Sequence, residues 1–319
     1  MKNKLLYIFA ALSFAACSHD DISQAVALDI RLDSSNTYKA GETVNFLVDG
    51  NADNLLFYSG ETGSQYKYKD RYNVSAESVK SAKLELEIKS QYGNPEGLDI
   101  YVSNKFEGLL GNDGAADRAT IKKLEAGKMA GWKKMGFDEQ TNKWTLNSID
   151  VNDCLDNFCM AIHWHPKRDG KNAQRTYLVN GGISLEIEGA APAKLKISDM
   201  GLISVMMNEE IADPYKKNSG KGSIIFNAPQ TAEIQFKGVA PNDLPSALDG
   251  WVFCVPSKLD KVPNDKGLVV KNMQNYVKSF QHIYMQPGTY TATIVGTNRN
   301  YKGSSSEVRE MKVIITDKL

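Results

Sequence analysis

The sequence has little cysteine and no excess of charge of either sign. Only 4 of its 319 residues are cysteine, which is too few for a framework of disulfide bonds, so the fold must depend on a hydrophobic core. Lysine and arginine together number 38, and so do aspartate and glutamate. Because the formal net charge is zero, the composition gives no reason to expect binding to nucleic acid or to an anionic membrane surface.

Motifs for covalent catalysis and for phosphate binding are also missing. The chain contains no Gly-x-Ser-x-Gly, no His-Glu-x-x-His and no phosphate-binding glycine loop, which are motifs of hydrolases, zinc proteases and nucleotide-binding proteins. The sequence therefore predicts no catalytic residue, no cofactor and no bound metal, and it favours a protein that is not an enzyme. A pair of carboxylates for glycoside hydrolysis stays open, because the fold sets their separation.

Only one long apolar run occurs, and it lies at the start of the sequence. Two lysines precede the apolar residues 5–14, and two alanines come directly before Cys17. This order of positive charge, apolar core and small residues is typical of a secretory signal peptide, and the run is too short to span a bilayer as a helix. Residues 1–16 are therefore predicted to be a signal peptide.

The residues around Cys17 resemble a bacterial lipobox, although Phe14 stands where leucine is usual. The resemblance implies that Cys17 is acylated and that residues 17–25 form a lipidated linker. A plain signal peptide with an incidental Cys17 is the alternative. Asp20 and Asp21 follow, and this acidic cluster is similar to the surface-export signal of Bacteroidota lipoproteins. We therefore expect a lipid-anchored protein of the outer membrane that faces the extracellular side.

Alternating polar and apolar residues dominate the rest of the chain. The clearest alternation occurs over residues 27–32, 43–48, 83–89, 183–187 and 289–294. One side chain in two then faces a core, and turn residues separate the runs at the spacing typical of antiparallel sandwiches. The expected fold class is all-β, with stacked β-sandwich modules. The one helix that we expect is short, over residues 115–124.

The chain divides by pattern into three blocks, over residues 26–75, 76–190 and 191–319. The order of strands and loops in the middle block resembles the jelly-roll domains of secreted bacterial proteins. The first and last blocks are distantly alike, since each has a strand, a polar loop and an aromatic-rich strand. We therefore expect PKD-type, immunoglobulin-like blocks at both ends and a jelly-roll-like domain between them.

The last block contains a hairpin that resembles the closing hairpin of PKD-type domains, with Tyr284, Pro287, Gly288 and Tyr290 in the usual order. Proline presets a negative φ, and glycine accepts the positive φ that a type II turn requires. Gly288 is therefore predicted to have a positive φ, and Tyr290 is predicted to point into the core.

Segments 57–63, 66–68, 102–108 and 287–290 together resemble a Bacteroidota surface lipoprotein family whose domain has no known function. Members are often encoded beside glycan uptake systems of the SusC/SusD type. The resemblance implies a non-catalytic lipoprotein that binds an extracellular polysaccharide or oligosaccharide, with SusC/SusD-like transport proteins as further partners. Two alternatives stay open: a structural or adhesive lipoprotein with a protein partner, and a glycoside hydrolase with an unrecognised site.

Aromatic side chains are the best candidates for contact with a glycan, because sugars present apolar C–H faces to a ring. Three tryptophans fall in the middle block, and two tyrosines lie in a polar segment without a core pattern. The five candidate ligand-binding residues are Trp132, Trp144, Trp164, Tyr66 and Tyr68. The alternative for each is a core position, since most tryptophans in sandwiches are buried.

His163 and His165 flank Trp164, so on a strand both imidazoles lie on one face. Two such histidines can chelate Zn²⁺, but a zinc site needs at least one more protein ligand. Asp169 and Cys159 are near in sequence, yet no recognised spacing results. The sequence favours the alternative, in which the end of a strand meets a polar loop.

The cysteines after Cys17 leave one question open. Cys154 and Cys159 are close enough in sequence to bridge a tight turn, and two buried free thiols are equally consistent with the pattern. Cys254 lies in an alternating run and is predicted to be a core residue.

Overall fold

The computed structural model describes residues 25–92, 96–138, 140–167, 176–207, 222–228, 232–238, 248–301 and 303–317. Most of these residues lie in β-strands, which confirms the predicted all-β class. None of the helices within the described ranges is long and apolar enough to cross a membrane. The predicted signal peptide, Cys17 and Asp169 lie outside the described residues.

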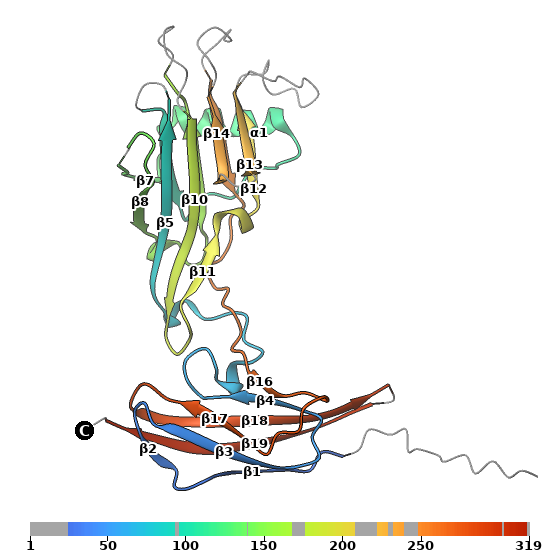
Figure 1. Ribbon diagram of the computed structural model, residues 1–319. Helices are drawn as coiled ribbons and strands as arrows, with labels where there is room; N and C mark the ends of the chain where they lie inside the picture. The colour runs from blue at the N-terminus through green and yellow to red at the C-terminus, as the bar shows by residue number, and fades with distance from the viewer. Residues whose placement is uncertain are drawn as a thin grey trace, which may run out of the picture. The chain divides into compact units, whose positions relative to one another are not determined.

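The chain forms two compact domains, and the first is built from both ends of the sequence (Figure 1). The terminal domain contains the described residues of 25–69 and 265–317, and the inserted domain contains those of 70–264. The three predicted blocks are therefore wrong as boundaries. The first block and the end of the third form one domain, whereas residues 191–264 belong with the middle block.

The terminal domain is a sandwich of a three-stranded and a five-stranded sheet. The smaller sheet has the order β1 (Leu28–Leu32), β3 (Thr43–Gly50), β17 (Ser279–Ile283). The larger sheet has the order β16 (Leu268–Lys271), β4 (Asn54–Tyr58), β18 (Gly288–Asn300), β19 (Gly303–Thr316), β2 (Thr37–Lys39). Every pairing is antiparallel except that of β2 with β19.

Three phenylalanines join the two ends of the chain in the core of the terminal domain. Phe46 on β3, Phe57 on β4 and Phe280 on β17 have ring centroids 4.9–5.0 Å apart in each pair. Such aromatic pairs contribute about 0.5–1.5 kcal/mol beyond the area that they bury. Because two of these rings precede the inserted domain and one follows it, this core forms only when both ends of the chain meet.

The predicted type II turn at Gly288 is wrong. Gly288 begins β18 opposite Ile315, and it is not among the glycines with positive φ. A Cβ built there would lie 3.4 Å from the ring of Tyr290, which is ordinary van der Waals contact. Tyr290 is half-buried: its ring stacks on Tyr284 with centroids 4.6 Å apart, and its hydroxyl donates to the Gln286 carbonyl. The chain bends before residue 288 and is already extended there.

The inserted domain is a sandwich of two antiparallel sheets, in agreement with the β-sandwich predicted for the middle block. The first sheet has the order β13 (Ser223–Ala228), β14 (Ala232–Lys237), β10 (Thr176–Ile187), β5 (Val79–Gln91), β8 (Thr145–Asp150), and β11 (Ala193–Lys196) also pairs with β10. The second sheet has the order β12 (Leu202–Met206), β15 (Gly250–Cys254), β9 (Cys159–Trp164), β6 (Leu98–Ser103), β7 (Lys133–Met135).

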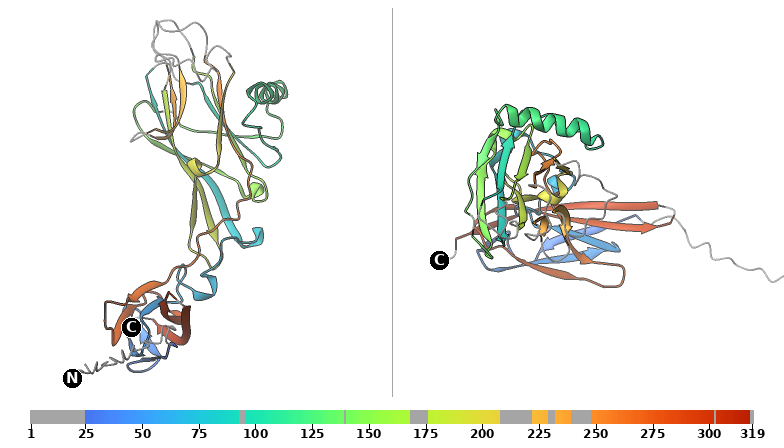
Figure 2. Two further views of the ribbon diagram at one scale, coloured as in Figure 1. Left: turned by 90° about the vertical axis from the view of Figure 1, so that its right-hand side faces the viewer. Right: turned by 90° about the horizontal axis from the view of Figure 1, so that it is seen from above.

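Helix α1 (Gly114–Ala126) confirms the expected helix and lies along one side of the inserted domain (Figure 2). The side chain of Asp113 accepts hydrogen bonds from the first-turn amides of Ala115 and Ala116, as a good N-cap does. Ile121 is fully buried in the domain core. The segment around α1 also covers the outer face of the second sheet, where Trp132 packs on Phe253 of β15.

We expect residues 70–264 to fold when expressed alone, because both sheets of the inserted domain lie within this range. Far-UV circular dichroism should show strand, and heating should give one cooperative transition. A fragment of residues 191–319 should stay unfolded, since it lacks β10, the partner of β14, and β3 and β4 of the terminal domain. Cooperative melting of residues 191–319 together with failure of residues 70–264 would contradict this division.

Candidate functional site

The described residues contain two groups of side chains with the chemistry of a site, one in each domain. The first, here named the histidine cluster, consists of Asp99, Glu125, His163, His165 and Asp249 in the inserted domain. The second, here named the tyrosine pocket, lies on the terminal domain and is lined by Asp29, Arg31, Leu47, Val48, Asp49, Tyr276 and Lys278.

The histidine cluster starts from a row of residues across three strands of the second sheet. In the ladder, Asp99 of β6 lies opposite His163 of β9, and His163 lies opposite Trp251 of β15. Residues that are paired in this way share one face of a sheet. The indole of Trp251 is nearly parallel to the imidazole of His163, with ring centroids 4.0 Å apart, so the imidazole is held in one orientation.

Two carboxylates converge on His163 from outside this row. Nε2 of His163 lies 2.9 Å from Oδ1 of Asp249 and 4.0 Å from Oε1 of Glu125. Glu125 lies in the last turn of α1, and Asp249 directly precedes β15. The indole nitrogen of Trp251 donates to the same Glu125 oxygen at 3.2 Å. One imidazole therefore faces two acidic side chains whose positions are fixed by neighbouring elements.

Asp99 is the most strongly paired acid of the cluster. Its Oδ2 lies 3.3 Å from Nε2 of His165 and accepts from the Tyr101 hydroxyl at 3.3 Å, and its Oδ1 lies 2.7 Å from Nζ of Lys134. The hydrogen bond from His165, followed by the one from Lys134, holds the pKa of Asp99 well below its usual range despite partial burial. Asp99 is thus a carboxylate at any ordinary pH.

The prediction that His163 and His165 share one face is confirmed, since their ring centroids lie 4.4 Å apart. Of the two further ligands considered from the sequence, Asp169 lies outside the described residues, and Cys159 does not join the two histidines. Cys159 is buried, and its thiol donates to the Cys254 carbonyl at 3.1 Å. The acidic neighbours come instead from β6, α1 and the start of β15, because strand pairing and the helix bring together residues that are far apart in sequence.

Cys154, Cys159 and Cys254 are all buried free thiols. The structure therefore agrees with the free-thiol alternative and contains no bond between Cys154 and Cys159. Burial raises the pKa of Cys154 to about 12. The hydrogen bond with Cys254, with burial, likewise raises the pKa of Cys159. Buried thiols whose pKa is raised in this way are unreactive, so Cys154 and Cys159 serve as packing in the core.

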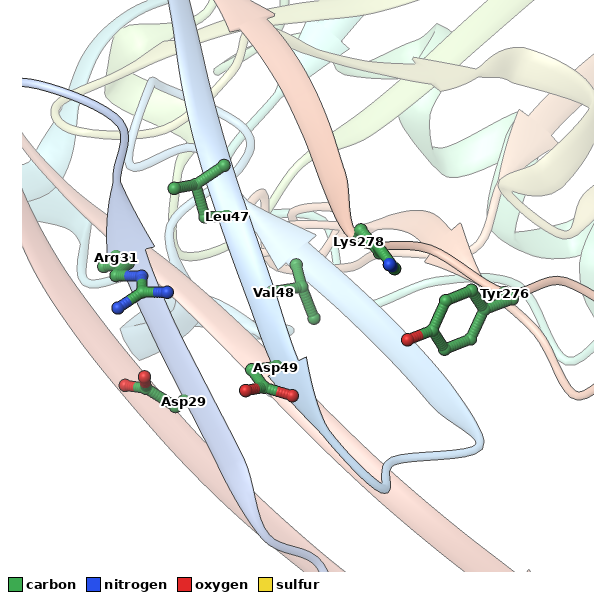
Figure 3. A pocket seen from close by; sticks show the side chains of 7 residues that line it. All are labelled: Asp29, Arg31, Leu47, Val48, Asp49, Tyr276 and Lys278. Carbon is green, nitrogen blue, oxygen red and sulfur yellow. The ribbon is translucent and has the colours of Figure 1, made fainter.

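The tyrosine pocket is an open hollow of about 370 Å³ on the smaller sheet of the terminal domain. Asp29 and Asp49 are paired in the ladder of β1 and β3. Tyr276 and Lys278 come from the segment before β17, and Nζ of Lys278 lies 5.8 Å from the centroid of the Tyr276 ring. Figure 3 shows these two side chains on one side, Asp29 and Arg31 on the other, and β3 between them. The Tyr276 ring is 80% exposed.

Trp164, the tryptophan on which the predicted glycan contact chiefly rested, is fully buried. Its ring packs on Phe236 of the opposite sheet, with centroids 5.8 Å apart, so Trp164 is a core residue and the prediction of a ligand contact there is wrong. The physical reason is the alternation of the strand. His163 and His165 face outward, and the residue between them must face inward.

The other four predicted aromatics are more accessible, and they are divided between the two domains. Trp132 is half-buried against Phe106 and Phe253, and Trp144 is 37% exposed. Tyr66 and Tyr68 lie in a short 3-10 turn of the terminal domain and are half-buried.

Two aromatic residues that sequence reasoning did not select belong to the site candidates. Trp251 lies in an alternating run and is buried, so its pattern is that of a core residue, and only the ladder places it beside His163. Tyr276 lies in the polar segment 272–278 without alternation. Tyr66 was selected because it lies in a polar segment without a core pattern, and the same reason applies to Tyr276.

Fold and sites together define a two-domain all-β protein in which the described polar clusters lie on sheet faces. A family model described as a domain of unknown function (DUF5017) matches residues 16–124, which is less than half of the chain. The matched range runs from the terminal domain into the inserted domain and ends within α1. No curated protein and no solved structure matches the chain.

Replacing Trp164 by alanine should destabilise the inserted domain by about 3–5 kcal/mol, the range for large aromatic side chains truncated in a core. Trp144→Ala is the matched control, and it should change the free energy of unfolding by less than about 1 kcal/mol because this ring is partly exposed. Chemical denaturation of both variants measures the difference. Equal effects of the two substitutions would contradict the burial of Trp164.

Proposed function

We propose that this protein is a lipoprotein of the cell surface that binds an extracellular glycan without cleaving it, and that the tyrosine pocket contacts the glycan. The observation that carries this proposal is the exposed ring of Tyr276 at the edge of a hollow lined by charged groups. The surface location rests on the lipobox-like sequence before Cys17 and on Asp20 and Asp21.

The chemistry of the pocket suits a sugar. A pyranose ring has an apolar C–H face, which stacks on an aromatic ring, and hydroxyl groups at its rim, which bind carboxylates and guanidinium groups. The ring of Tyr276 supplies the first kind of surface and keeps its polar end in water. Asp29, Asp49 and Arg31 are exposed beside it and supply the second kind.

The balance of charge in the pocket favours a neutral glycan. Two acids, Asp29 and Asp49, lie with two bases, Arg31 and Lys278, so the lining groups sum to zero formal charge. A strongly anionic or cationic polymer would meet repulsion from one pair as well as attraction from the other. Hydroxyl groups can donate to the acids and accept from the bases. An open, shallow site of this kind is suited to weak binding of a long polymer.

A protein partner is the second candidate, and one observation favours it. The edge strand β16 carries Leu268 and Val269, which are 60% and 62% exposed. Exposed apolar side chains on an unpaired sheet edge are typical of a surface that pairs with another chain. Leu268→Lys should abolish capture of a protein partner and leave glycan binding intact, so the two candidates are separable.

Tyr276→Ala should weaken glycan binding at least tenfold, about 1.4 kcal/mol, because the stacking surface is removed. The melting temperature should barely change, since the ring is exposed. Tyr301→Ala is the matched control: Tyr301 is also 80% exposed and lies in the same domain, but it does not line the pocket. A glycan array with the chain from Ser18 onward, followed by isothermal titration, measures both variants.

Equal binding by the Tyr276 and Tyr301 variants would remove the pocket from the proposal. A chain that binds no glycan in a broad panel but captures a protein through β16 would favour the adhesive alternative. Release of reducing sugar from any bound polysaccharide would favour the glycoside hydrolase alternative instead.

Cys17→Ala should leave the protein unprocessed or release it from the membrane fraction of cells, because two or three acyl chains at about 0.8 kcal/mol per buried methylene provide the anchor. Protease added to intact cells should degrade the native protein, and replacement of Asp20 and Asp21 by alanine should protect it while acylation continues. Normal processing and membrane retention of the Cys17 variant would show that the anchor lies elsewhere.

A further inference from the structure

We propose that Glu125, His163 and Asp249 bind one divalent transition-metal ion on the outer face of the second sheet of the inserted domain. This site is separate from the tyrosine pocket, which belongs to the other domain. The sequence alone favoured no metal, because neither of the acids that complete the set is close to His163 in sequence. The chain has four histidines, and two of them meet at this cluster.

The geometry matches the spacing of ligands around such an ion. One nitrogen or oxygen from each of the three residues lies within 4.8 Å of the others, and Nε2 of His163 is 2.9 Å and 4.0 Å from the two carboxylate oxygens. Two atoms bound at 2.0–2.2 Å to a tetrahedral zinc ion lie about 3.3–3.6 Å apart. The two distances from His163 therefore lie within about half an ångström of this spacing, and the two carboxylate oxygens are no more than 4.8 Å apart.

The ligands are also held in place by groups that are not themselves ligands. Trp251 stacks on the His163 ring and donates to Oε1 of Glu125, so a single indole orients two of the three. The third, Asp249, is fixed through its backbone carbonyl, which accepts from the Met207 amide at 2.9 Å. Outer contacts of this kind typically support metal ligands and increase their affinity for the ion.

The local electrostatics favour a cation beside Glu125 and Asp249. Their two carboxylates lie beside one imidazole, and carboxylate and imidazole are both usual ligands of zinc. Glu125 lies in the last turn of α1, where the partial negative charge of the helix terminus attracts a cation. A divalent ion would balance two acids and leave His163 neutral, the form in which imidazole binds metals.

A second set of three potential ligands shares His163 and consists of Asp99, His163 and His165. The charges around this second set are less suitable for binding a cation. Nζ of Lys134 lies 2.7 Å from Asp99, so an ion there would face a fixed ammonium group as well as the carboxylate. The side chains of Glu125, His163 and Asp249 are 33%, 18% and 38% exposed. The ion would therefore reach solvent and keep a coordination position for water or for an oxygen of a ligand.

The test uses the full chain, purified in detergent, stripped of metal with a chelator and titrated with zinc chloride alone by calorimetry. The expected result is one ion per chain. Glu125→Gln and Asp249→Asn each keep the shape of the side chain and remove its charge, and each should weaken zinc binding at least tenfold. Zinc should also raise the melting temperature of the wild-type inserted domain, and this rise should be lost in both variants.

Two control variants separate this site from nonspecific binding and from the neighbouring set. Glu61→Gln alters a histidine–carboxylate pair of the terminal domain, in which His282 lies 2.7 Å from Glu61, and it should leave zinc affinity unchanged. Asp99→Asn should also leave it unchanged. The proposal is overturned if the wild type binds zinc no better than the Glu125 and Asp249 variants, or if Asp99→Asn weakens binding and Glu125→Gln does not.

Discussion

The pairing of β4 with β18 is the constraint on which the rest of the chain depends. It joins Asn54–Tyr58 to a strand that begins at Gly288, and the phenylalanines 46, 57 and 280 pack together around this junction. Contacts so distant in sequence are entropically costly to form. The cost is smaller if the inserted domain folds by itself and acts as a compact connection between the two halves. An independently stable insertion therefore favours formation of the terminal domain.

Alternation in the sequence was sufficient to predict several of the strands but not their grouping. Residues 43–48, 83–89 and 289–294 alternate, and each run lies within a strand, β3, β5 and β18 respectively. The period of two identifies which side chains face a core, but it contains no information about which core they face. Strands β14 and β15 lie within residues 191–264, yet they pair with β10 and β9, which precede them in the chain. The type II turn failed similarly, since a Pro-Gly pair is compatible with a bend that ends before the glycine.

The histidine cluster shows the same limit at the scale of one site. Strand alternation places His163 and His165 together, and the structure agrees. That rule also requires Trp164 to lie on the opposite face, in the core, so the tryptophan and the histidines could never have served one surface. The acids near them, Asp99, Glu125 and Asp249, come from three separate elements. The register of β6, β9 and β15 and the position of α1 bring them together, and register depends on the whole sheet.

The family match covers some residues of each site and leaves out others. Residues 16–124 contain Asp29, Arg31 and Asp49 of the tyrosine pocket but neither Tyr276 nor Lys278. They contain Asp99 of the histidine cluster but stop just before Glu125. The other members of the cluster lie further along the chain. The tyrosine pocket and the histidine cluster thus each combine residues inside the matched range with residues outside it. The chemistry proposed for this protein depends on residues that the matched range does not include.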